Sequence, residues 1–337
     1  HAQLLPVHHR EPGINIGVGA AAHRPPHLTG EALLGHYGLR RGSRLAHAFS
    51  CVDFEVLARR YGKMGGFAHL ATLVKLIQSQ RPGAILVDGG DSWQGSATAL
   101  WTRGADMVAA SKLLGVKVMT GHWEFTLGAE RVMELIRHDM PGSIDFIAHN
   151  VFTRDFGDRV FPPFVIKEID GLDVAIIGQA YPYTPIANPQ YLIPDWTFGI
   201  HERSLRETIN DVRKLKVAAI VLLSHNGIDV DLKLASRVEG LTAILGGHTH
   251  DALPKAMRIK NDGGETLVAN GGSNGKFIGV LDIFSRHGRT GCDYALMPVF
   301  SNLLEPDAEM AALIAQIRRP FESSLGQVLA VTDDLLY

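Results

Sequence analysis

The chain has 337 residues, of which 46% are hydrophobic and 20% charged, and its net charge is −2. This length supports one large α/β domain or two smaller ones with a sizeable core. The near-neutral charge provides no global basic surface for nucleic acid, and no apolar run reaches the ~20 residues of a membrane-spanning helix. Cys51 and Cys292 form no metal-type cluster, and they could be free thiols or one disulfide.

Strands and helices are predicted to alternate along most of the chain. Residues 18–66 are rich in Lys, Arg, Pro and Gly, which indicates a partly irregular insertion with a short helix near 53–60. This insertion is either a solvated surface loop or a basic lip over an anionic substrate. Apolar runs predict strands at 84–90, 116–120, 145–151, 217–225, 241–248, 266–270, 276–284 and 292–299. Amphipathic stretches predict helices at 104–114, 128–138, 201–214, 231–238 and 307–319.

A hairpin is predicted over 164–180, where apolar and polar residues alternate around the turn signal Asp170-Gly171. Mixed strands with helices between them are typical of two packed sheets flanked by helices. The predicted fold class is therefore α/β, a four-layer α/β/β/α sandwich of two mixed β-sheets.

Polar residues gather just past the ends of the apolar strands, where α/β folds place their sites. A lone His there is more often structural. Gly-Gly-His-Thr-His-Asp (246–251) is a stronger signal, because the glycines allow a tight turn and histidines at i and i+2 can reach adjacent metals. Ligand-type residues after so many buried strands are unlikely to be an accident. The candidate metal ligands are His1, Asp91, His122, His225, His248 and His250.

Such a ligand set matches the needs of a dinuclear metal site. Two divalent cations roughly 3.5–4 Å apart need a bridging anion, which Asp91 can supply, while neutral imidazoles complete the coordination. A metal pair activates water near neutral pH. The mixed nitrogen and oxygen ligands suit Mn, Fe or Zn.

The motifs resemble, in order, the metallophosphoesterase core of the 5′-nucleotidase superfamily, which shows Asp-x-His, Gly-Asp, Gly-Asn-His-Glu, a lone His and Gly-His-x-His. Within it, the chain resembles the SoxB thiosulfohydrolases of bacterial sulfur oxidation, most specifically in GHWE (121–124) and LWTRG (100–104). The resemblance covers nearly the whole chain. It is carried by HAQLLPVHHREP (1–12), YGKMGGFAHLATL (61–73), DGGDSWQGSATALWTRG (88–104), TGHWEFT (120–126), AYPYTPIANP (180–189), PDWTFGI (194–200), LSHNGIDVDLKLASRV (223–238), LGGHTHD (245–251) and GGSNGKFIGVLD (271–282).

The resemblance implies two manganese ions, with Fe or Zn as alternatives. It implies that His1, Asp91 and His250 surround one ion, and that Asp91, His122, His225 and His248 surround the other. It also implies that residues 1–337 form a catalytic domain with an insertion at about 18–66. A first strand with a further Asp ligand and a C-terminal 5′-nucleotidase-type domain are then expected outside this sequence.

One departure from the superfamily pattern concerns the leaving group. His122 stands in place of the Asn ligand, and Trp123 stands in place of the His that assists the leaving group. General acid catalysis is typically worth ~10²–10⁴-fold for a poor leaving group such as an alkoxide. SoxB-type hydrolysis of a carrier-cysteine S-thiosulfonate instead leaves a persulfide anion, which needs little protonation. Trp123 then either forms an apolar wall for sulfur or packs in the core.

Further site candidates each have a plainer alternative. Glu124 is expected to hold a ligand or water, or else to be a surface carboxylate. Asn150 corresponds to a similar Asn of the family core, although a turn hydrogen bond is slightly favoured. Arg103 is expected either to meet sulfonate oxygens at the entrance or to form a salt bridge. Weaker candidates near the site are Trp101, Tyr181 and Tyr183, with His8 and His9 at the surface or behind a ligand.

The predicted function is thiosulfohydrolase activity, the release of sulfate from a carrier-protein cysteine S-thiosulfonate. The alternatives are a 5′-nucleotidase or other phosphoesterase, which Trp123 disfavours, and a non-catalytic binding domain, which the ligand set disfavours. The resemblance implies a partner, a heterodimeric Sox carrier protein with a cysteine-bearing C-terminal arm, and a location in the bacterial periplasm. No nucleic-acid or membrane partner is expected.

Overall fold

The structure is a computed structural model that describes residues 2–16, 27–286 and 289–333. The predicted metal ligand His1 lies outside the described residues. None of the described helices is both long and apolar enough to cross a membrane. The thiols of Cys51, which is exposed, and Cys292, which is buried, are both free, so the two cysteines form no disulfide.

The largest sheet has six strands in the order β10-β11-β9-β8-β6-β5. Its members are β5 (Phe164–Ile169), β6 (Leu172–Gln179), β8 (Ala219–Ser224), β9 (Ala243–Gly246), β10 (Met257–Asn261) and β11 (Gly264–Asn270). The four central strands run parallel, and the edge strands β5 and β10 pair antiparallel. The predicted hairpin turn joins β5 to β6, with φ of 49° at Asp170 and 76° at Gly171, as a tight hairpin turn requires.

A smaller layer of strands faces the inner side of this sheet. It contains the parallel sheet β1 (Leu86–Asp88), β2 (Val116–Met119) and β3 (Asp145–Phe146), and the hairpin of β12 (Phe277–Arg286) and β13 (Arg289–Pro298). Val118 of β2 belongs to the same buried cluster as Ile176 of β6 and Val221 of β8, and Leu281 of β12 packs against it. The two strand layers therefore share one apolar core.

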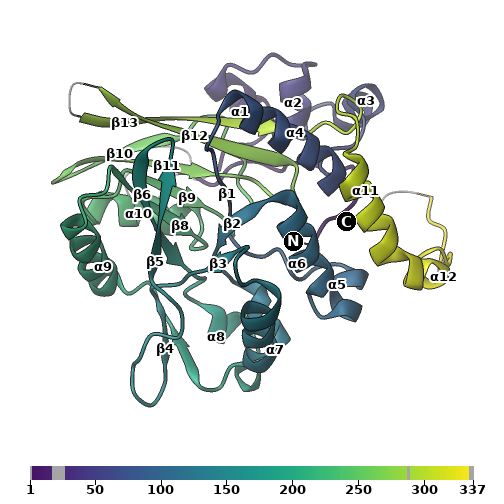
Figure 1. Cartoon of the computed structure of the whole chain (residues 1–337). Helices are drawn as coiled ribbons and strands as arrows, with labels where there is room; N and C mark the ends of the chain where they lie inside the picture. Colours follow the sequence, from purple (N-terminus) through teal and green to yellow (C-terminus); the bar gives the residue numbers. More distant parts are fainter. Residues whose placement is uncertain (1, 17–26, 287–288, 334–337) are drawn as a thin grey trace.

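Helices cover the outer side of each strand layer (Figure 1). On the six-stranded sheet, α9 (Glu202–Lys214) and α10 (Ile228–Arg237) bury their apolar faces. On the other side lie α4 (Phe67–Gln80), α6 (Ala105–Leu114) and α11 (Ala308–Arg318). The predicted four-layer α/β/β/α sandwich is confirmed.

Shorter elements connect these layers. They are α1 (Gly30–Tyr37), α2 (Arg44–Phe49), α3 (Phe54–Tyr61), α5 (Ala97–Thr102), η2 (Trp123–Leu127), α7 (Ala129–Glu134), η3 (Leu135–Asp139), α8 (Thr184–Ala187), η4 (Gln190–Leu192), η5 (Arg319–Phe321) and α12 (Glu322–Leu325). A separate two-stranded ladder pairs β4 (Val151–Thr153) with β7 (Trp196–Phe198).

Two predicted segments differ from the structure. The strand expected over 145–151 is broken after β3, because the chain turns through the buried polar residues His149 and Asn150 before β4. The insertion contains three described helices rather than one. Glycines at 30, 35 and 38 concealed the helical pattern of α1, whose Leu33 and Leu34 are buried in the core beneath it.

A cavity of about 360 Å³ lies between the two strand layers. Its apolar walls come from β1, β12 and the inner face of the six-stranded sheet. Its polar end is formed by the segments that follow β1, β8 and β9, with Asp91, His225, His248 and His250 among the lining residues. The fold thus places four of the predicted ligands at one end of the interlayer space.

At Gly178, β6 lies very close to the segment that follows β3. A Cβ atom at Gly178 would lie 2.2 Å from the carbonyl oxygen of Ile147. Gly178→Ala is therefore expected to lower the free energy of unfolding by about 1–3 kcal/mol in urea denaturation, the usual cost of overpacking. The matched control is Gly35→Ala, because Gly35 lies inside α1 and a Cβ atom added there would meet nothing within 4 Å. That control should gain about 0.5–1 kcal/mol; equal stability of the two variants would contradict the close approach.

Candidate metal centre

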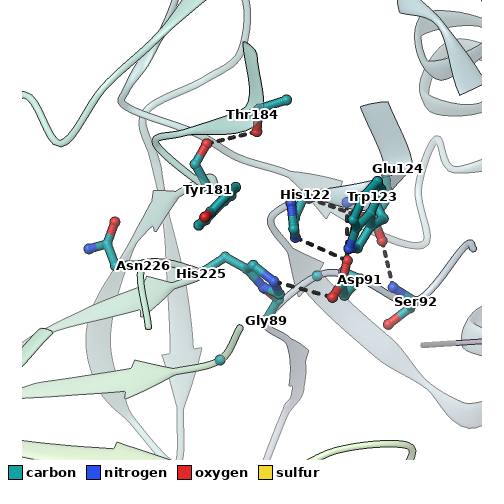
Figure 2. Close-up of polar contacts among 12 residues, drawn as sticks. Gly89, Asp91, Ser92, His122, Trp123, Glu124, Tyr181, Thr184, His225 and Asn226 are labelled. Atoms are coloured by element: carbon teal, nitrogen blue, oxygen red, sulfur yellow. Dashed lines mark hydrogen bonds and ion pairs between the residues drawn. The ribbon is translucent and has the colours of Figure 1, made fainter. Parts of the chain in front are cut away.

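Four parallel strands deliver four of the predicted ligands to one place. Asp91 follows β1, His122 follows β2, His225 follows β8 and His248 follows β9. Because the carboxyl ends of these strands lie at the same edge of the sandwich, their side chains meet. Figure 2 shows Asp91 facing both His122 and His225.

Three of these residues form a compact histidine cluster. His122, His225 and His248 each offer a ring nitrogen, and the three nitrogens lie within 4.8 Å of one another. His122 is 1% exposed and His225 is 2% exposed. Imidazole nitrogens bind zinc at about 2.0–2.1 Å, so nitrogens at this spacing can share one ion after small side-chain adjustments.

Asp91 lies between two of the histidines. Its Oδ1 is 3.2 Å from Nδ1 of His122, and its Oδ2 is 3.5 Å from Nε2 of His225. Burial opposes ionisation of Asp91, but the two imidazoles hold the pKa of this carboxyl below its usual range. Asp91 is therefore a carboxylate at neutral pH, and its two oxygens lie beside two histidines that are predicted to bind the same ion. Its role as a bridge to a second ion stays a prediction.

The histidine nitrogens meet a direct test of fit for a metal ion. Both ring nitrogens of His122 and Nε2 of His225 are buried and form no hydrogen bond within the described part of the chain; Nδ1 of His122 and Nε2 of His225 have only the Asp91 carboxylate beside them. Buried polar atoms almost always have a partner, so these three nitrogens call for a ligand. Nδ1 of His225 lies 2.7 Å from the carbonyl oxygen of Gly89. Because a carbonyl oxygen can only accept, Nδ1 carries the proton of the neutral ring, and Nε2 is left with a free lone pair.

The protonation states of the cluster also suit metal binding. Burial lowers the pKa of His122, and it lowers the pKa of His248 to about 3. For His225, burial again opposes protonation, but the Asp91 carboxylate outweighs it and raises the pKa. Neutral imidazoles present the lone pairs that a metal needs, and an ion beside His225 would compete with its proton.

Glu124 lies directly behind these ligands. Its carboxylate is fully buried, and Oε2 accepts hydrogen bonds from the backbone N–H groups of Asp91 (3.1 Å) and His122 (2.7 Å). Oε1 accepts from the N–H groups of Ser92 (2.6 Å) and Trp93 (3.3 Å). Glu124 therefore ties the segment after β1 to the segment after β2, and it is not a surface carboxylate.

Three candidate ligands have a backbone conformation that is rare outside glycine. The φ angles are 73° at Asp91, 77° at His248 and 61° at His250. Left-handed backbone at non-glycine residues costs about 1–3 kcal/mol and is found where function requires it. The strain coincides with the residues that the sequence singled out for metal binding.

His250 lies beside the cluster rather than inside it. It lines the interlayer cavity with His248, and it also lines a second cavity of about 580 Å³ together with His9, Arg10 and Cys51. Burial lowers the pKa of His250 to about 4, so this ring is neutral. Its role as a ligand of the second ion stays a prediction.

Two aromatic residues flank His122. Trp123 is half-buried, its ring centroid lies 4.9 Å from that of His122, and its backbone N–H donates to Oδ1 of Asp91 (3.1 Å). Tyr181 lies closer, with ring centroids 4.1 Å from His122 and 3.9 Å from His248. The sequence offered only a weak indication for Tyr181. Its segment AYPYTP (180–185) contains no ligand-type residue, and no turn motif in it predicts that the ring faces the site.

Asn150 and Arg103 make their described hydrogen bonds away from the histidine cluster, so a role of either residue in the site stays a prediction. Asn150 is fully buried, and its amide bonds to the backbone N–H and C=O of Ala180 and to the C=O of Gly199, each at 2.8 Å. Its polar atoms thus position backbone. Arg103 is exposed at the end of α5, where its carbonyl accepts from Arg131, and it lines neither described cavity.

The sequence missed a buried polar network beside His225. Asp231 of α10 accepts hydrogen bonds from the hydroxyl of Ser224 (2.7 Å) and the amide of Asn226 (3.0 Å), the two neighbours of His225. Gln179 at the end of β6 donates to Asn226 (3.0 Å). Burial raises the pKa of Asp231 to about 7. These residues carry no ligand spacing, so only the folded structure brings them together to hold the loop of His225.

The importance of Glu124 can be measured through metal affinity. Glu124→Gln removes the negative charge and leaves one oxygen to serve four N–H donors. Loss of such a supporting group typically costs 10–100-fold in metal affinity, and about that loss is expected in a competition titration with a chelating dye. Glu134→Gln is the control, because Glu134 is exposed and pairs with Arg131 at the surface. Equal affinity of both variants would show that Glu124 does not support the ligands.

Comparisons with known proteins agree with this site. No family model matches the chain. The 5′-nucleotidase of Rattus norvegicus is 25% identical over 290 residues, which cover 80% of this chain and 50% of that protein. The structure of a 5′-nucleotidase precursor of Thermus thermophilus superposes with a TM-score of 0.72 at 24% identity, covering 80% of this chain and 55% of the other.

A solved structure of the sulfate thiohydrolase SoxB of Thermus thermophilus is more similar still. It superposes with a TM-score of 0.88 at 34% identity, covering 96% of this chain and 59% of that one. The chain thus spans about half the length of the curated relatives that it matches. With a shared sandwich, a histidine cluster and homology to metal-dependent enzymes, the chain belongs to the 5′-nucleotidase superfamily of metallophosphoesterases and is SoxB-like within it.

Proposed function

We propose that this chain carries the catalytic centre of a thiosulfohydrolase, which hydrolyses a carrier-protein cysteine S-thiosulfonate and releases sulfate. The observation that carries the proposal is the position of Trp123. Its indole lies beside the candidate ligand His122, at the place where phosphoesterases of the superfamily have the His that assists the leaving group. The likeness to SoxB at 34% identity supports the same reaction.

The metal proposed for this centre is a pair of manganese ions. Asp91, His122, His225 and His248 would hold one ion, and Asp91 with His250 would contribute to the other. Carboxylate and imidazole ligands without thiolate suit Mn and do not exclude Fe or Zn. When bound, such ions activate water and neutralise charge on an anionic substrate.

The proposed reaction balances without an oxidant. Water attacks the sulfonate sulfur, a sulfur–oxygen bond forms, and the sulfur–sulfur bond to the carrier breaks. Sulfate leaves with the new oxygen, the carrier keeps a persulfide anion, and the two protons of water go to solvent. Because a persulfide anion is a stable leaving group, the site needs no proton donor where Trp123 stands.

Trp123 contributes a surface rather than a proton. Indole carries one N–H donor and no acceptor, so it cannot take a proton, and its face is apolar and polarisable. The ring is half-buried, which leaves part of its surface for a substrate. Polarisable sulfur is therefore the leaving atom that this wall accommodates best.

The second candidate function is hydrolysis of phosphate esters. The 5′-nucleotidases among the relatives favour it, and the proposed metal ligands would serve either reaction. A nucleotide, however, releases a nucleoside alkoxide that benefits from a general acid. Trp123 offers none, which is why the sulfur substrate is preferred here.

The proposal extends to the partner and the compartment. The substrate would be presented by a heterodimeric Sox carrier whose C-terminal arm bears the reactive cysteine, and the encounter would take place in the bacterial periplasm. Both extensions depend on the likeness to SoxB. A thin peptide arm is the kind of substrate that can bring a cysteine to histidines as deeply buried as His122 and His225.

A side-by-side assay tests this function. The full-length protein, loaded with Mn²⁺, is given thiosulfate-charged carrier in one reaction and nucleoside monophosphates in another. Sulfate release without phosphate release is expected, and a chelator should abolish it. Phosphate release without sulfate release would overturn the proposal.

The variant Trp123→His sharpens the same assay. An imidazole at this position can donate a proton to an alkoxide, so phosphate release should rise at least about tenfold, part of the 10²–10⁴-fold of general acid catalysis. Trp123→Phe is the matched control, because it keeps an aromatic wall without an acid and should gain no phosphatase activity. Phosphate release that does not distinguish His from Phe would contradict the explanation for Trp123.

A further inference from the structure

We infer that the ring of Tyr181 is a positioning residue of the metal centre, which holds His248 and His122 in the orientation that binds the ion. This inference rests on the proposed function, since it concerns the same centre. Tyr181 comes from the loop between β6 and α8, far in sequence from both histidines. Figure 2 shows Tyr181 and Trp123 on different sides of His122.

The need for such support arises at His248. Unlike His122 and His225, this residue is only partly buried, and it lies in a loop between Gly247 and Thr249 with a left-handed φ of 77°. A partly exposed side chain in a glycine-flanked loop has several rotamers open to it. A ligand that visits several rotamers binds metal more weakly, because binding must first select one of them.

Tyr181 supplies the closest aromatic contact of His248. The two ring centroids are 3.9 Å apart and the planes are tilted by 30°, so one face of the imidazole lies against the tyrosine ring. The centroids of His122 and His225 lie farther from His248, at 5.0 Å and 5.4 Å. A flat ring against the imidazole therefore fixes the plane in which the nitrogen lone pairs of His248 lie.

The same ring also reaches the second ligand. The centroid of Tyr181 lies 4.1 Å from that of His122, with the planes inclined by 50°. One side chain thus touches two ligands that follow strands of different sheets. A hydrogen-bonded carboxylate or carbonyl usually orients a ligand histidine, as the Gly89 carbonyl does for His225. At His248 the tilted ring of Tyr181 takes that place.

The backbone of Tyr181 is anchored, so its ring can act as a fixed wall. Its N–H donates to the carbonyl oxygen of Gly121 (3.1 Å), the residue before His122. Its carbonyl oxygen accepts from the hydroxyl of Thr184 (2.8 Å), a contact drawn in Figure 2. The backbone of Tyr181 is therefore bonded to the same segment that carries the ligand His122.

Metal affinity provides the test, because it is read without any substrate. Mn²⁺ affinity of the full-length protein is measured by chelator competition for wild type, Tyr181→Ala, Tyr181→Leu and Tyr181→Phe. The Ala and Leu variants should bind about tenfold more weakly or worse, as for loss of other groups that orient ligands. Tyr181→Phe, which keeps the ring, should stay within about threefold of wild type. Excess Mn²⁺ should restore turnover to the Ala and Leu variants, whereas a misfolded protein would not recover.

Tyr191→Ala is the matched control, because Tyr191 is an exposed aromatic residue on η4 and should leave metal affinity unchanged. Wild-type affinity in Tyr181→Leu would overturn the inference, since Leu keeps the bulk but not the flat ring. A Phe variant as weak as Ala would also overturn it, because the hydroxyl would then be the working group. If wild type binds Mn²⁺ but cleaves no charged carrier, the proposed function fails while the role of Tyr181 is still decided by affinity alone.

Discussion

The buried carboxylate of Glu124 is the constraint on which the candidate centre depends. Four backbone N–H groups from the segments after β1 and β2 converge on its two oxygens, and two of them belong to Asp91 and His122. A carboxylate that is removed from water stays favourable only with several donors around it. The same bonds that stabilise Glu124 therefore set the distance between a predicted bridging carboxylate and a predicted histidine ligand.

The other candidate ligands are held by contacts of different kinds. His225 faces the Gly89 carbonyl through Nδ1, and the loop that carries it is bonded to Asp231 of α10. His248 has the ring of Tyr181 against it. The result is a cluster of imidazoles next to one ionised carboxylate, with buried, unsatisfied nitrogens on His122 and His225. That combination of charge and lone pairs suits divalent cations.

Local patterns in the sequence predicted the four layers, the hairpin at Asp170-Gly171 and the ligands after the strands. The layers and the hairpin are confirmed, and three of the predicted ligands meet in one cluster, because a buried strand and the glycines after it leave a clear local signal. For Glu124 the sequence left a supporting role and a surface position open, because its four partners come from two segments. Asn150, Tyr181 and the Asp231 network could not be assigned, because their roles depend on contacts between residues distant in the chain. The helix α1 was missed because packing of Leu33 and Leu34 outweighs its glycines.

The candidate metal centre is tested most directly by locating the bound metal. Crystals of the full-length, Mn²⁺-loaded protein should give an anomalous scattering peak bounded by the ring nitrogens of His122, His225 and His248, with a carboxylate oxygen of Asp91 within coordination distance. A second peak on the far side of Asp91, near His250, would complete the pair. A fully loaded crystal with no peak between these side chains, or with its metal bound elsewhere, would contradict the centre described here.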